Sequence, residues 1–450
     1  MRTLHGISGA IYPYMMDVKI EKLIYGGEGL AHHEGATVFV PFVLPGELAS
    51  ATPAEQKKKF IRARLDRIVE ASPERIAPKC PHFGVCGGCD YQHIAYEPQL
   101  AFKKEILRET LRRIGRIDWP GEITTHASHP WAYRNRAQWK VRPLEAESET
   151  ETAASGPEGK AKLGIGYFKA NSTALCAVST CEIISPLLLK TLLALRKSLA
   201  AGELPRGLRE IEAFVNASDS QLLLTATFAG FPSRAAEHAE TFRRIAPETV
   251  SLLFHDPSRD RMELFGPGYI EYEAAGTAYR VGHFSFFQVN KLLADTLVDL
   301  VVGREEGGRM ALDLFAGVGL FSIPLAEKFE KVLSIESNPA ATRDLEANMR
   351  GKGAIEARTN DVDRFMARSK ERPDLVVLDP PRAGMTPEAM QRLARMLPGR
   401  ITYVSCEPPT LARDLAILIA AGYSCAEVHV IDLFPQTFHM ETVVRLRRGR

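Results

Sequence analysis

Cys406 is the side chain best suited to covalent chemistry, because it ends a strand-like run just before a helical pattern. Residues 401–406 read Ile-Thr-Tyr-Val-Ser-Cys, and Glu407, Pro408 and Pro409 separate them from a helix expected to begin near Thr410. A thiol at a helix N-terminus lies in partial positive charge, which lowers its pKa and favours the nucleophilic thiolate. The competing interpretation is a small buried hydrophobic side chain, the commonest role of a single cysteine.

A glycine turn and a carboxylate predict a site for a nucleoside-containing cofactor. Gly317 and Gly319 follow the strand-like run 310–315 and allow a sharp turn close to a ligand, and Glu336 ends the next run. A carboxylate at such a strand end can accept hydrogen bonds from ribose hydroxyls. The turn lacks the Lys-Ser/Thr of a phosphate-binding loop and the third glycine of the dinucleotide fingerprint. S-adenosylmethionine, with adenosine but no pyrophosphate, fits better, and an ordinary structural turn is the alternative.

Asp379 is a second candidate at a strand end. It closes the run 374–379 and is followed by Pro380, Pro381 and Arg382. Prolines there fix a rigid turn at the edge where open α/β sheets bind ligands, so Asp379 is expected to face the crevice. The alternative, a cap for the helix expected near Thr386, fits less well because two prolines and a glycine intervene.

Three closely spaced cysteines predict an inorganic centre. Cys80, Cys86 and Cys89 lie within ten residues, and glycines between them let the loop wrap around a metal. Such thiolates suit either an iron–sulfur cluster or structural zinc. The chain has seven cysteines and no recognisable signal peptide, so a reducing compartment is expected, where metal binding or catalysis is commoner than a disulfide.

The elements that must position these residues fall into three parts. Residues 1–72 contain short strand-like runs and a glycine-rich turn, which predict a small β-barrel. Residues 73–280 predict a central α/β region with the cysteine group, a helix at 97–115, and a mobile acidic hairpin insertion at 144–162. Residues 281–450 alternate strand-like runs with helices expected at 320–329, 338–350, 386–397 and 410–422. This alternation predicts an α/β fold with a doubly wound, mostly parallel sheet.

The composition is that of an ordinary globular protein, with 45% hydrophobic and 25% charged residues and a net charge of +2. No apolar run approaches a membrane span, so we expect a cytoplasmic protein with no membrane contact. The net charge does not itself predict nucleic-acid binding, but local basic and aromatic clusters can provide phosphate and base contacts. The alternative is that each cluster is an ordinary solvated face. The first cluster contains Lys57, Lys58, Lys59, Phe60, Arg62 and Arg64, and the second contains Trp131, Tyr133, Arg134, Asn135 and Arg136.

The joint order of the motifs resembles the 5-methyluridine RNA methyltransferases, over almost the whole chain. The motifs are Phe287-Gln-Val-Asn290, Asp379-Pro-Pro-Arg382, Ser405-Cys-Glu-Pro408 and His439-Met-Glu441, and the front barrel resembles the RNA-binding TRAM module. The resemblance implies a Rossmann-like class I methyltransferase at the C-terminus and an OB-like barrel at the N-terminus. It also implies that the helix at 97–115 packs on the catalytic part.

By the same residue-wise match, Cys406 would add to carbon 6 of the uracil and Glu441 would remove the carbon-5 proton. From sequence alone Glu441 could equally be a rim carboxylate paired with an arginine. His439 is expected to be structural or a neighbour of the site. The residues that would contact S-adenosylmethionine are Gln288, Phe315, Glu336, Asp379 and Asp361, for which Asn360 is an alternative alignment.

The resemblance also favours a 4Fe-4S cluster over zinc. Family members with this pattern take a fourth ligand from a later Cys-x-x-x-x-Pro segment, which Cys181 to Pro186 matches, while Cys176 is a nearby rival. The expected substrate is RNA, with 23S ribosomal RNA preferred and transfer RNA second, and no obligate protein partner is evident. Rival classes are an inactive RNA-binding iron–sulfur protein, which intact Asp379, Cys406 and Glu441 argue against, and a methyltransferase for an exocyclic nitrogen or a small molecule.

Overall fold

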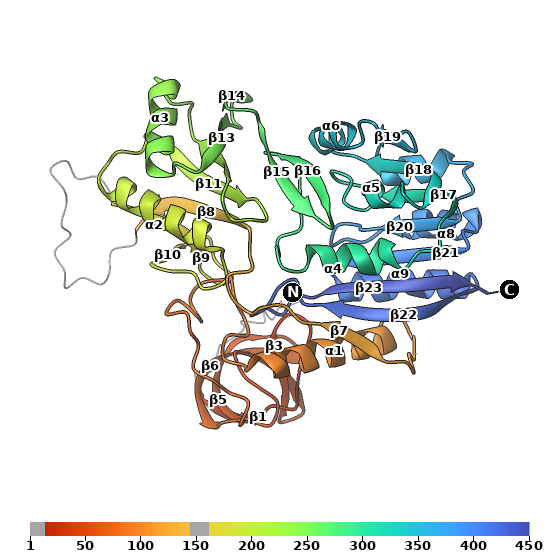
Figure 1. Ribbon diagram of the computed structural model, residues 1–450. Helices are drawn as coiled ribbons and strands as arrows, with labels where there is room; N and C mark the ends of the chain where they lie inside the picture. Colours follow the sequence, from red (N-terminus) through yellow and green to blue (C-terminus); the bar gives the residue numbers. More distant parts are fainter. Residues whose placement is uncertain (1–13, 145–161, 450) are drawn as a thin grey trace, which may run out of the picture.

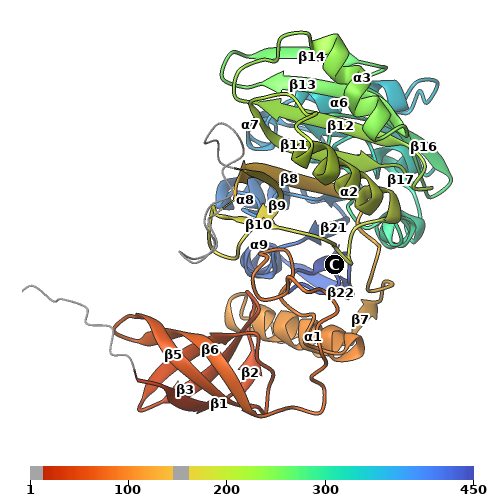
Figure 2. The ribbon, with the colours of Figure 1, turned by 90° about the vertical axis from the view of Figure 1, so that its left-hand side faces the viewer.

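The fold was analysed in a computed structural model that describes residues 14–144 and 162–449. Three sheets follow one another along the chain and are visible as separate bodies in Figures 1 and 2. Almost all of the predicted acidic hairpin insertion lies outside the described residues. Within the described residues, no helix has both the length and the apolar character that crossing a membrane requires.

The first sheet has six strands in the order β1-β5-β6-β4-β3-β2 and encloses its own small apolar core. Side chains alternate between that core and solvent, as Val38 and Val40 of β4 show, and both are fully buried. Irregular register between β5 and β6 bends the sheet so that it can curve around the core. The strands are β1 (Met16–Lys19), β2 (Lys22–Leu23), β3 (Glu28–His33), β4 (Ala36–Pro41), β5 (Leu48–Gln56) and β6 (Phe60–Glu70).

The middle sheet has seven strands in the order β10-β9-β8-β11-β12-β13-β14, with α2 and α3 packed into its core. Its mixed pattern includes one parallel pair, β12 with β13, while the other neighbours are antiparallel. The elements are β8 (Arg136–Pro143), β9 (Leu163–Phe168), β10 (Leu175–Ala177), α2 (Pro186–Ala200), β11 (Leu208–Val215), β12 (Leu222–Phe228), α3 (Ala235–Ile245), β13 (Thr249–Asp256) and β14 (Arg261–Phe265).

A hairpin, β15 (Tyr269–Ala274) with β16 (Thr277–Gly282), leads from the middle sheet to the C-terminal one. Tyr272 and Tyr279 of the hairpin pack in the core of the C-terminal part, where the ring centroids of Tyr272 and Phe287 lie 4.5 Å apart. Asp344 of α6 (Pro339–Asn348) fixes the end of the hairpin by accepting hydrogen bonds from the Arg280 guanidinium and the Gly282 amide. The hairpin therefore holds the two larger bodies in a defined arrangement.

The C-terminal sheet has eight strands in the order β19-β18-β17-β20-β21-β23-β22-β7. The first five are parallel and β17 and β20 are neighbours, so the strand order reverses between them, and the α/β prediction is confirmed. The elements are α4 (Ala294–Val298), π-helix η1 (Asp299–Gly303), β17 (Gly308–Leu314), α5 (Ser322–Leu325), β18 (Phe329–Glu336), α6 (Pro339–Asn348), β19 (Ile355–Thr359), α7 (Val362–Arg368), β20 (Leu375–Leu378), α8 (Pro387–Met396), β21 (Arg400–Ser405), α9 (Pro408–Ala420), β22 (Tyr423–Ile431) and β23 (Glu441–Arg448).

The helix predicted at 320–329 was wrong in extent, because α5 is a single turn. Buried Phe329 pairs with Gly308 at the start of the β17–β18 ladder, so the chain must already be extended there. The Lys328 amide hydrogen-bonds to the carbonyl of Leu325, only three residues back, as in a tightened turn. Strand pairing therefore overrides the helical pattern of the sequence.

The C-terminal sheet is completed by a segment from the first third of the chain. Helix α1 (Tyr96–Arg113) shares the core of α9, and β7 (Ile123–His126) pairs in parallel with β22 (Figure 1). Lys103 of α1 donates hydrogen bonds to the Asp432 carboxylate at 2.6 Å and to the Phe434 carbonyl at 3.1 Å. Both charged side chains are fully buried, so each supplies the charge that the other needs in a nonpolar surrounding.

We expect Lys103→Met to destabilise the fold by about 3–5 kcal/mol, because it leaves the Asp432 carboxylate buried without its cation. The free energy of unfolding is to be measured by urea denaturation. Lys19→Ala is the matched control, because Lys19 pairs with Glu70 at 3.4 Å on the surface and its loss should cost less than about 1 kcal/mol. Equal effects of the two substitutions would contradict a structural role for the buried pair.

Candidate active site

The pairing of β21 with β23 brings the candidate nucleophile and the candidate base together. Ser405, the last residue of β21, lies opposite Thr442 in this antiparallel ladder. Cys406, which directly follows β21, therefore neighbours Glu441, the residue before Thr442. Cys406 is half-buried and Glu441 is buried, with its Oε1 atom lacking a hydrogen-bond partner within the described chain. Two residues far apart in sequence thus form one polar site at the end of β21.

Two further carboxyl groups lie at the neighbouring strand ends. Leu314 of β17 pairs with Leu378 of β20, so Asp313 and Asp379 approach each other where the strand order reverses. Burial raises the pKa of Asp313 to about 7, against the hydrogen bond that the Ser322 hydroxyl donates to it at 2.5 Å. Burial and the charge of Asp313 raise the pKa of Asp379. Such a cluster favours a positively charged ligand, which would stabilise the ionised carboxylates.

Burial, together with the carboxyl groups of Glu441 and Asp379, raises the pKa of the Cys406 thiol to about 12, against the opposing charge of Arg382. The expectation of a thiol pKa lowered by the helix N-terminus was therefore wrong for the protein without ligands. Helix α9 does begin close by, at Pro408. The partial charge of the helix is outweighed, because desolvation and three nearby carboxyl groups, of Glu441, Asp379 and Glu407, disfavour the thiolate.

The pKa of Glu441 is raised well above its ordinary value, first by burial and then by the charge of Asp379. A raised pKa makes the carboxylate a stronger base than that of an ordinary glutamate, which suits general acid–base catalysis. His439, close by in the chain, lies with its Nε2 atom 3.3 Å from the Arg382 guanidinium, and burial lowers its pKa to about 3. His439 is therefore neutral, and Glu441 is the better proton acceptor.

The glycine turn after β17 is fixed by Glu336. The Glu336 carboxylate accepts hydrogen bonds from the Gly317 amide at 2.9 Å and the Asn338 amide at 2.7 Å. Phe315 has a φ of 66°, unusual for an aromatic residue, and a Cβ atom on Gly319 would lie 2.6 Å from Leu345. The turn therefore forms a narrow, preorganised cradle beside Glu336.

The remaining predicted cofactor residues differ in position. Gln288 is buried in the segment that crosses from β16 to α4, and its carbonyl accepts a hydrogen bond from Asn135. Asp361 is exposed and caps α7 by accepting a hydrogen bond from the Arg364 amide at 3.0 Å. The Asn360 amide instead donates to the Glu336 carbonyl at 2.8 Å.

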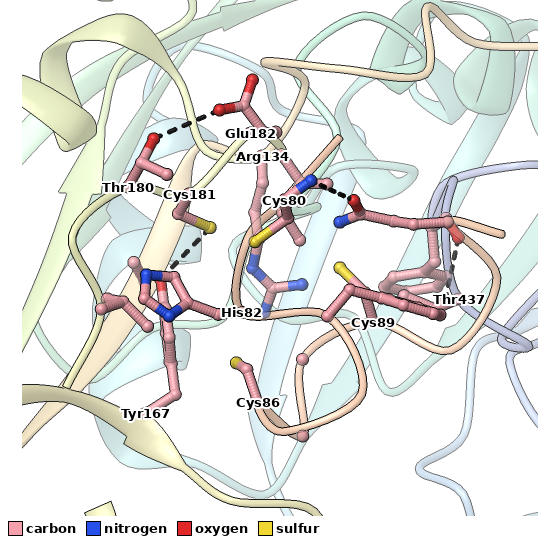
Figure 3. Close-up of a pocket in the computed structure, with 18 of the residues that line it drawn as sticks. Cys80, His82, Cys86, Cys89, Arg134, Tyr167, Thr180, Cys181, Glu182 and Thr437 are labelled. Atoms are coloured by element: carbon pink, nitrogen blue, oxygen red, sulfur yellow. Dashed lines mark hydrogen bonds between the residues drawn. The ribbon is translucent and has the colours of Figure 1, made fainter. Parts of the chain in front are cut away.

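The predicted metal ligands surround one cavity of about 360 Å³. Figure 3 shows the sulfur atoms of Cys80, Cys86, Cys89 and Cys181 directed toward a common space. Cys176 does not line this cavity, although it lies next to Cys86. Burial raises the pKa of all five thiols, and to about 12 for Cys86. In the described part of the chain, no three His, Cys, Asp or Glu side chains form a group that could hold a metal ion.

The cysteine cavity and the catalytic candidates share the segment 432–440, which links β22 to β23. Phe434, Thr437 and His439 of this segment line the cavity, and Glu441 follows directly. The amides of Asp90 and Tyr91, next to Cys89, both donate to the Gln436 carbonyl at 3.0 Å. The cysteine loop thus helps to fix the chain that leads to Glu441, which the sequence did not predict.

One contact in the site comes from the barrel. The Tyr25 hydroxyl, in the turn between β2 and β3, donates to Oε2 of Glu407 at 2.9 Å. It also lies 3.4 Å from the carbonyl oxygen of Cys406. The sequence gives no signal for this contact apart from an aromatic residue before two glycines, since nothing relates positions so far apart.

The second basic and aromatic cluster does not form an RNA-facing surface as a whole. Tyr133 and Asn135 are fully buried, and Tyr133 donates to the Pro435 carbonyl at 2.9 Å. Arg136 lies over the Phe214 ring at 4.3 Å and donates to the Ser285 carbonyl. These side chains join the middle sheet to the C-terminal part, so the prediction of an RNA contact there was wrong for them.

Comparisons with known proteins cover nearly the whole chain. Residues 270–449 match the family model described as tRNA (uracil-5-)-methyltransferase. A 23S rRNA (uracil-C(5))-methyltransferase of Salmonella paratyphi A is 33% identical, over 96% of this chain and 96% of its own. The corresponding enzyme of Alkalilimnicola ehrlichii is 30% identical over the same shares, and an uncharacterized RNA methyltransferase of Aquifex aeolicus is 31% identical, over 96% and 98%.

Among solved structures, the Pyrococcus abyssi tRNA (uracil-54, C5)-methyltransferase in complex with S-adenosyl-L-homocysteine matches with a TM-score of 0.72. The sequences are 24% identical, and the match covers 96% of this chain and 100% of that one. The likeness shows that the two chains share a fold.

We expect the alkylation rate of Cys406 by iodoacetamide to rise about tenfold per pH unit from pH 7 to pH 10, because the thiolate fraction does so while the pH stays below the raised pKa. The measurement is mass spectrometry of the Cys406 peptide. The urea-unfolded protein is the control, and its rate should level off near the ordinary thiol pKa of about 8.5. A plateau at the same pH in the folded protein would contradict the raised pKa.

Proposed function

We infer that this chain, which belongs to the RNA (uracil-5-)-methyltransferase family, methylates carbon 5 of a uridine in 23S ribosomal RNA with S-adenosylmethionine as the methyl donor. The RNA assignment rests on the names of relatives that align over nearly the whole chain. The observation that carries the chemistry is the adjacency of Cys406 and Glu441 through the β21–β23 register. We place the reaction in the cytoplasm, where ribosomal RNA meets the protein.

Cys406 acts as the covalent nucleophile in this proposal. Carbon 5 of uracil is a poor nucleophile, and addition of the Cys406 thiolate to carbon 6 converts the ring into an enolate with electron density at carbon 5. S-adenosylmethionine supplies an electrophilic methyl group on a positively charged sulfur. Carbon 5 forms a bond to this methyl group as the bond between the methyl carbon and the sulfonium sulfur breaks, which leaves S-adenosylhomocysteine. The ring then carries both a methyl group and a proton at carbon 5, with the Cys406 sulfur bonded at carbon 6.

Glu441 resolves the adduct. Its carboxylate accepts the carbon-5 proton, the double bond between carbons 5 and 6 reforms, and the Cys406 sulfur leaves as a thiolate. Burial and the raised pKa of Glu441 support this assignment, because they strengthen its carboxylate as a base. Asp379 contributes negative charge beside both groups.

We place S-adenosylmethionine at the ends of β17, β18 and β20. We assign its contacts to Gln288, Phe315, Glu336, Asp379 and Asp361, for which Asn360 is the alternative alignment. The support is that Glu336 is already fixed beside the glycine turn, where its carboxylate oxygens could accept further hydrogen bonds donated by ribose hydroxyls. The carboxyl cluster around Asp379 suits a sulfonium cation.

The RNA follows a groove of about 1020 Å³ between the barrel, the cysteine loop and β8–β9. Residues 1–72 act as a TRAM-like RNA-binding module in this proposal, with Arg62 and Arg64 on one wall. The opposite wall holds Phe168, whose ring lies 5.5 Å from the Lys140 ammonium group and 5.8 Å from the Arg142 guanidinium carbon. Aromatic rings beside cations suit unpaired bases next to phosphates, and the target base must leave the RNA stack to reach Cys406.

Transfer RNA is the second candidate substrate, because the matching family model carries tRNA in its description. The two substrates are distinguished by mapping 5-methyluridine in cells that lack the protein. Loss of one 5-methyluridine from 23S ribosomal RNA supports the first assignment, and loss from transfer RNA supports the second.

We further propose that Cys80, Cys86, Cys89 and Cys181 hold a 4Fe-4S cluster. Their four sulfur atoms line one cavity, which is the ligand number that such a cluster takes. Four thiolates suit either an iron–sulfur cluster or structural zinc by their chemistry. The resemblance to family members with this cysteine pattern favours the cluster. Methylation consumes no electrons, so the cluster would stabilise the cysteine loop and, through Gln436, the segment before Glu441.

We expect Cys406→Ala to abolish methylation and adduct formation, because no other thiol replaces the nucleophile. Glu441→Gln should form the adduct with RNA but release it at least about 100-fold more slowly, because the base that removes the proton is gone. Denaturing electrophoresis of labelled RNA with the protein measures the adduct, and Cys425→Ala is the control with normal turnover. Full methylation activity of Cys406→Ala would contradict the proposed mechanism.

We expect anaerobically prepared protein to contain about four iron atoms and matching labile sulfide per chain. Cys86→Ser should lose both and melt at a lower temperature, because the loop loses its cross-link. The control is Cys425→Ser, a substitution on β22 outside the cavity, which should keep the iron. Protein that contains zinc and no iron after anaerobic preparation would refute the cluster assignment.

A further inference from the structure

The barrel reaches the catalytic cysteine through a single aromatic residue. The Tyr25 hydroxyl donates to Glu407 at 2.9 Å, and Glu407 directly follows Cys406. The Tyr25 hydroxyl is also 3.4 Å from the Cys406 carbonyl oxygen, so it contacts both residues of the turn between β21 and α9. Burial and the Glu407 carboxylate raise the pKa of Tyr25, so the phenol stays protonated and remains a donor.

The surroundings of Tyr25 show that this contact is part of a packed interface. Its ring meets the Phe438 ring edge-on, with the centroids 5.4 Å apart. Two residues further on, Gly27 has a φ of 85°, and a Cβ atom there would lie 3.3 Å from Phe438 and 3.4 Å from Asp90. The barrel turn therefore fits closely against the segment that leads to Glu441, and the Tyr25 side chain has little freedom to move away.

The charges around the Cys406 thiol explain why the position of Glu407 matters. The thiol is faced by Glu441 of β23, by Asp379 and Arg382 after β20, and by Glu407 before α9. Three of these four groups are acidic and oppose the thiolate. Of these groups, the Glu407 carboxylate is the one that the barrel contacts, through the hydrogen bond from the Tyr25 hydroxyl.

We propose that Tyr25 is a positioning residue for the reaction, which fixes the Glu407 carboxylate and with it the turn that carries the Cys406 nucleophile. The inference rests on the proposed function, in which Cys406 attacks the uracil ring. It adds that the barrel takes part in building the catalytic site, besides any contact with RNA. Without the Tyr25 hydroxyl, the Glu407 carboxylate is free to turn toward the thiol, and its negative charge then disfavours the thiolate.

The first test needs no RNA and no methyl donor, so its outcome is independent of the proposed function. It measures the alkylation rate of the Cys406 peptide between pH 7 and pH 10 in the full chain. We expect Tyr25→Phe to slow alkylation about three- to tenfold at each pH, because the thiolate is further disfavoured. Glu407→Gln removes the charge and should speed it. In the Glu407→Gln background, Tyr25→Phe should change the rate less than twofold.

The second test is steady-state methylation of RNA. We expect Tyr25→Phe to lower kcat about tenfold with KM for RNA within twofold of the unmodified protein, since the nucleophile and not RNA binding is affected. Tyr423→Phe is the matched control, because its hydroxyl donates one hydrogen bond, to the Pro398 carbonyl at 2.9 Å, far from the site. It should leave kcat, KM and alkylation unchanged.

The outcomes separate the alternatives. An increased KM with unchanged kcat would overturn the proposal, because Tyr25 would then only bind RNA. The proposal would also be overturned if Tyr25→Phe slowed alkylation equally in the wild-type chain and in the Glu407→Gln variant. If Tyr25→Phe does not fold, Glu407→Gln tests the pair from the other side, and unchanged alkylation in that variant would overturn the proposal. If the wild-type protein does not methylate RNA but the alkylation of Cys406 follows the expected pattern, only the proposed function is rejected.

Discussion

The buried ion pair between Lys103 and Asp432 ties the front of the chain to the segment that leads to Glu441. The same segment is held by Gln99 of α1, whose side chain exchanges two hydrogen bonds of 3.1 Å with Gln436. The cysteine loop donates to the Gln436 carbonyl and the barrel turn packs on Phe438. Three elements from the first third of the chain, which are α1, the cysteine loop and the barrel turn, thus determine where Glu441 stands relative to Cys406.

The sequence was sufficient to predict the alternating strands and helices of the C-terminal sheet, because apolar runs alternate with amphipathic helices there. The order of its strands is known only from the structure. The sequence also singled out Cys406, Asp379 and Glu336 from their places at strand ends. It failed where distant pairing decides, as with the single turn of α5 and the addition of β7 to β22. Tyr133 and Asn135 look like an RNA-binding cluster in sequence, yet burial makes them part of the core.

The electrostatics of the site differ from what local sequence suggests. A helix N-terminus alone favours a thiolate, but Cys406 is also desolvated and lies near acidic groups, so its pKa rises to about 12. Asp313, Asp379 and Glu441 all have raised pKa values because they share a buried space. Such crowding destabilises the fold and is typical of sites that are built around charge developed during a reaction. The protein keeps this arrangement through the packing of its surrounding elements.

The addition of β7 to the edge of β22 bears on how such a protein can be rearranged by recombination of genes. Residues 96–126 fold with the sheet made by residues 308–448, although the whole middle sheet lies between them in sequence. A crossover placed after residue 280 would deliver a sheet that lacks its outer strand and exposes the edge of β22. The barrel can be exchanged as a unit only by a crossover before α1, and the new barrel must then provide its own contact for Glu407.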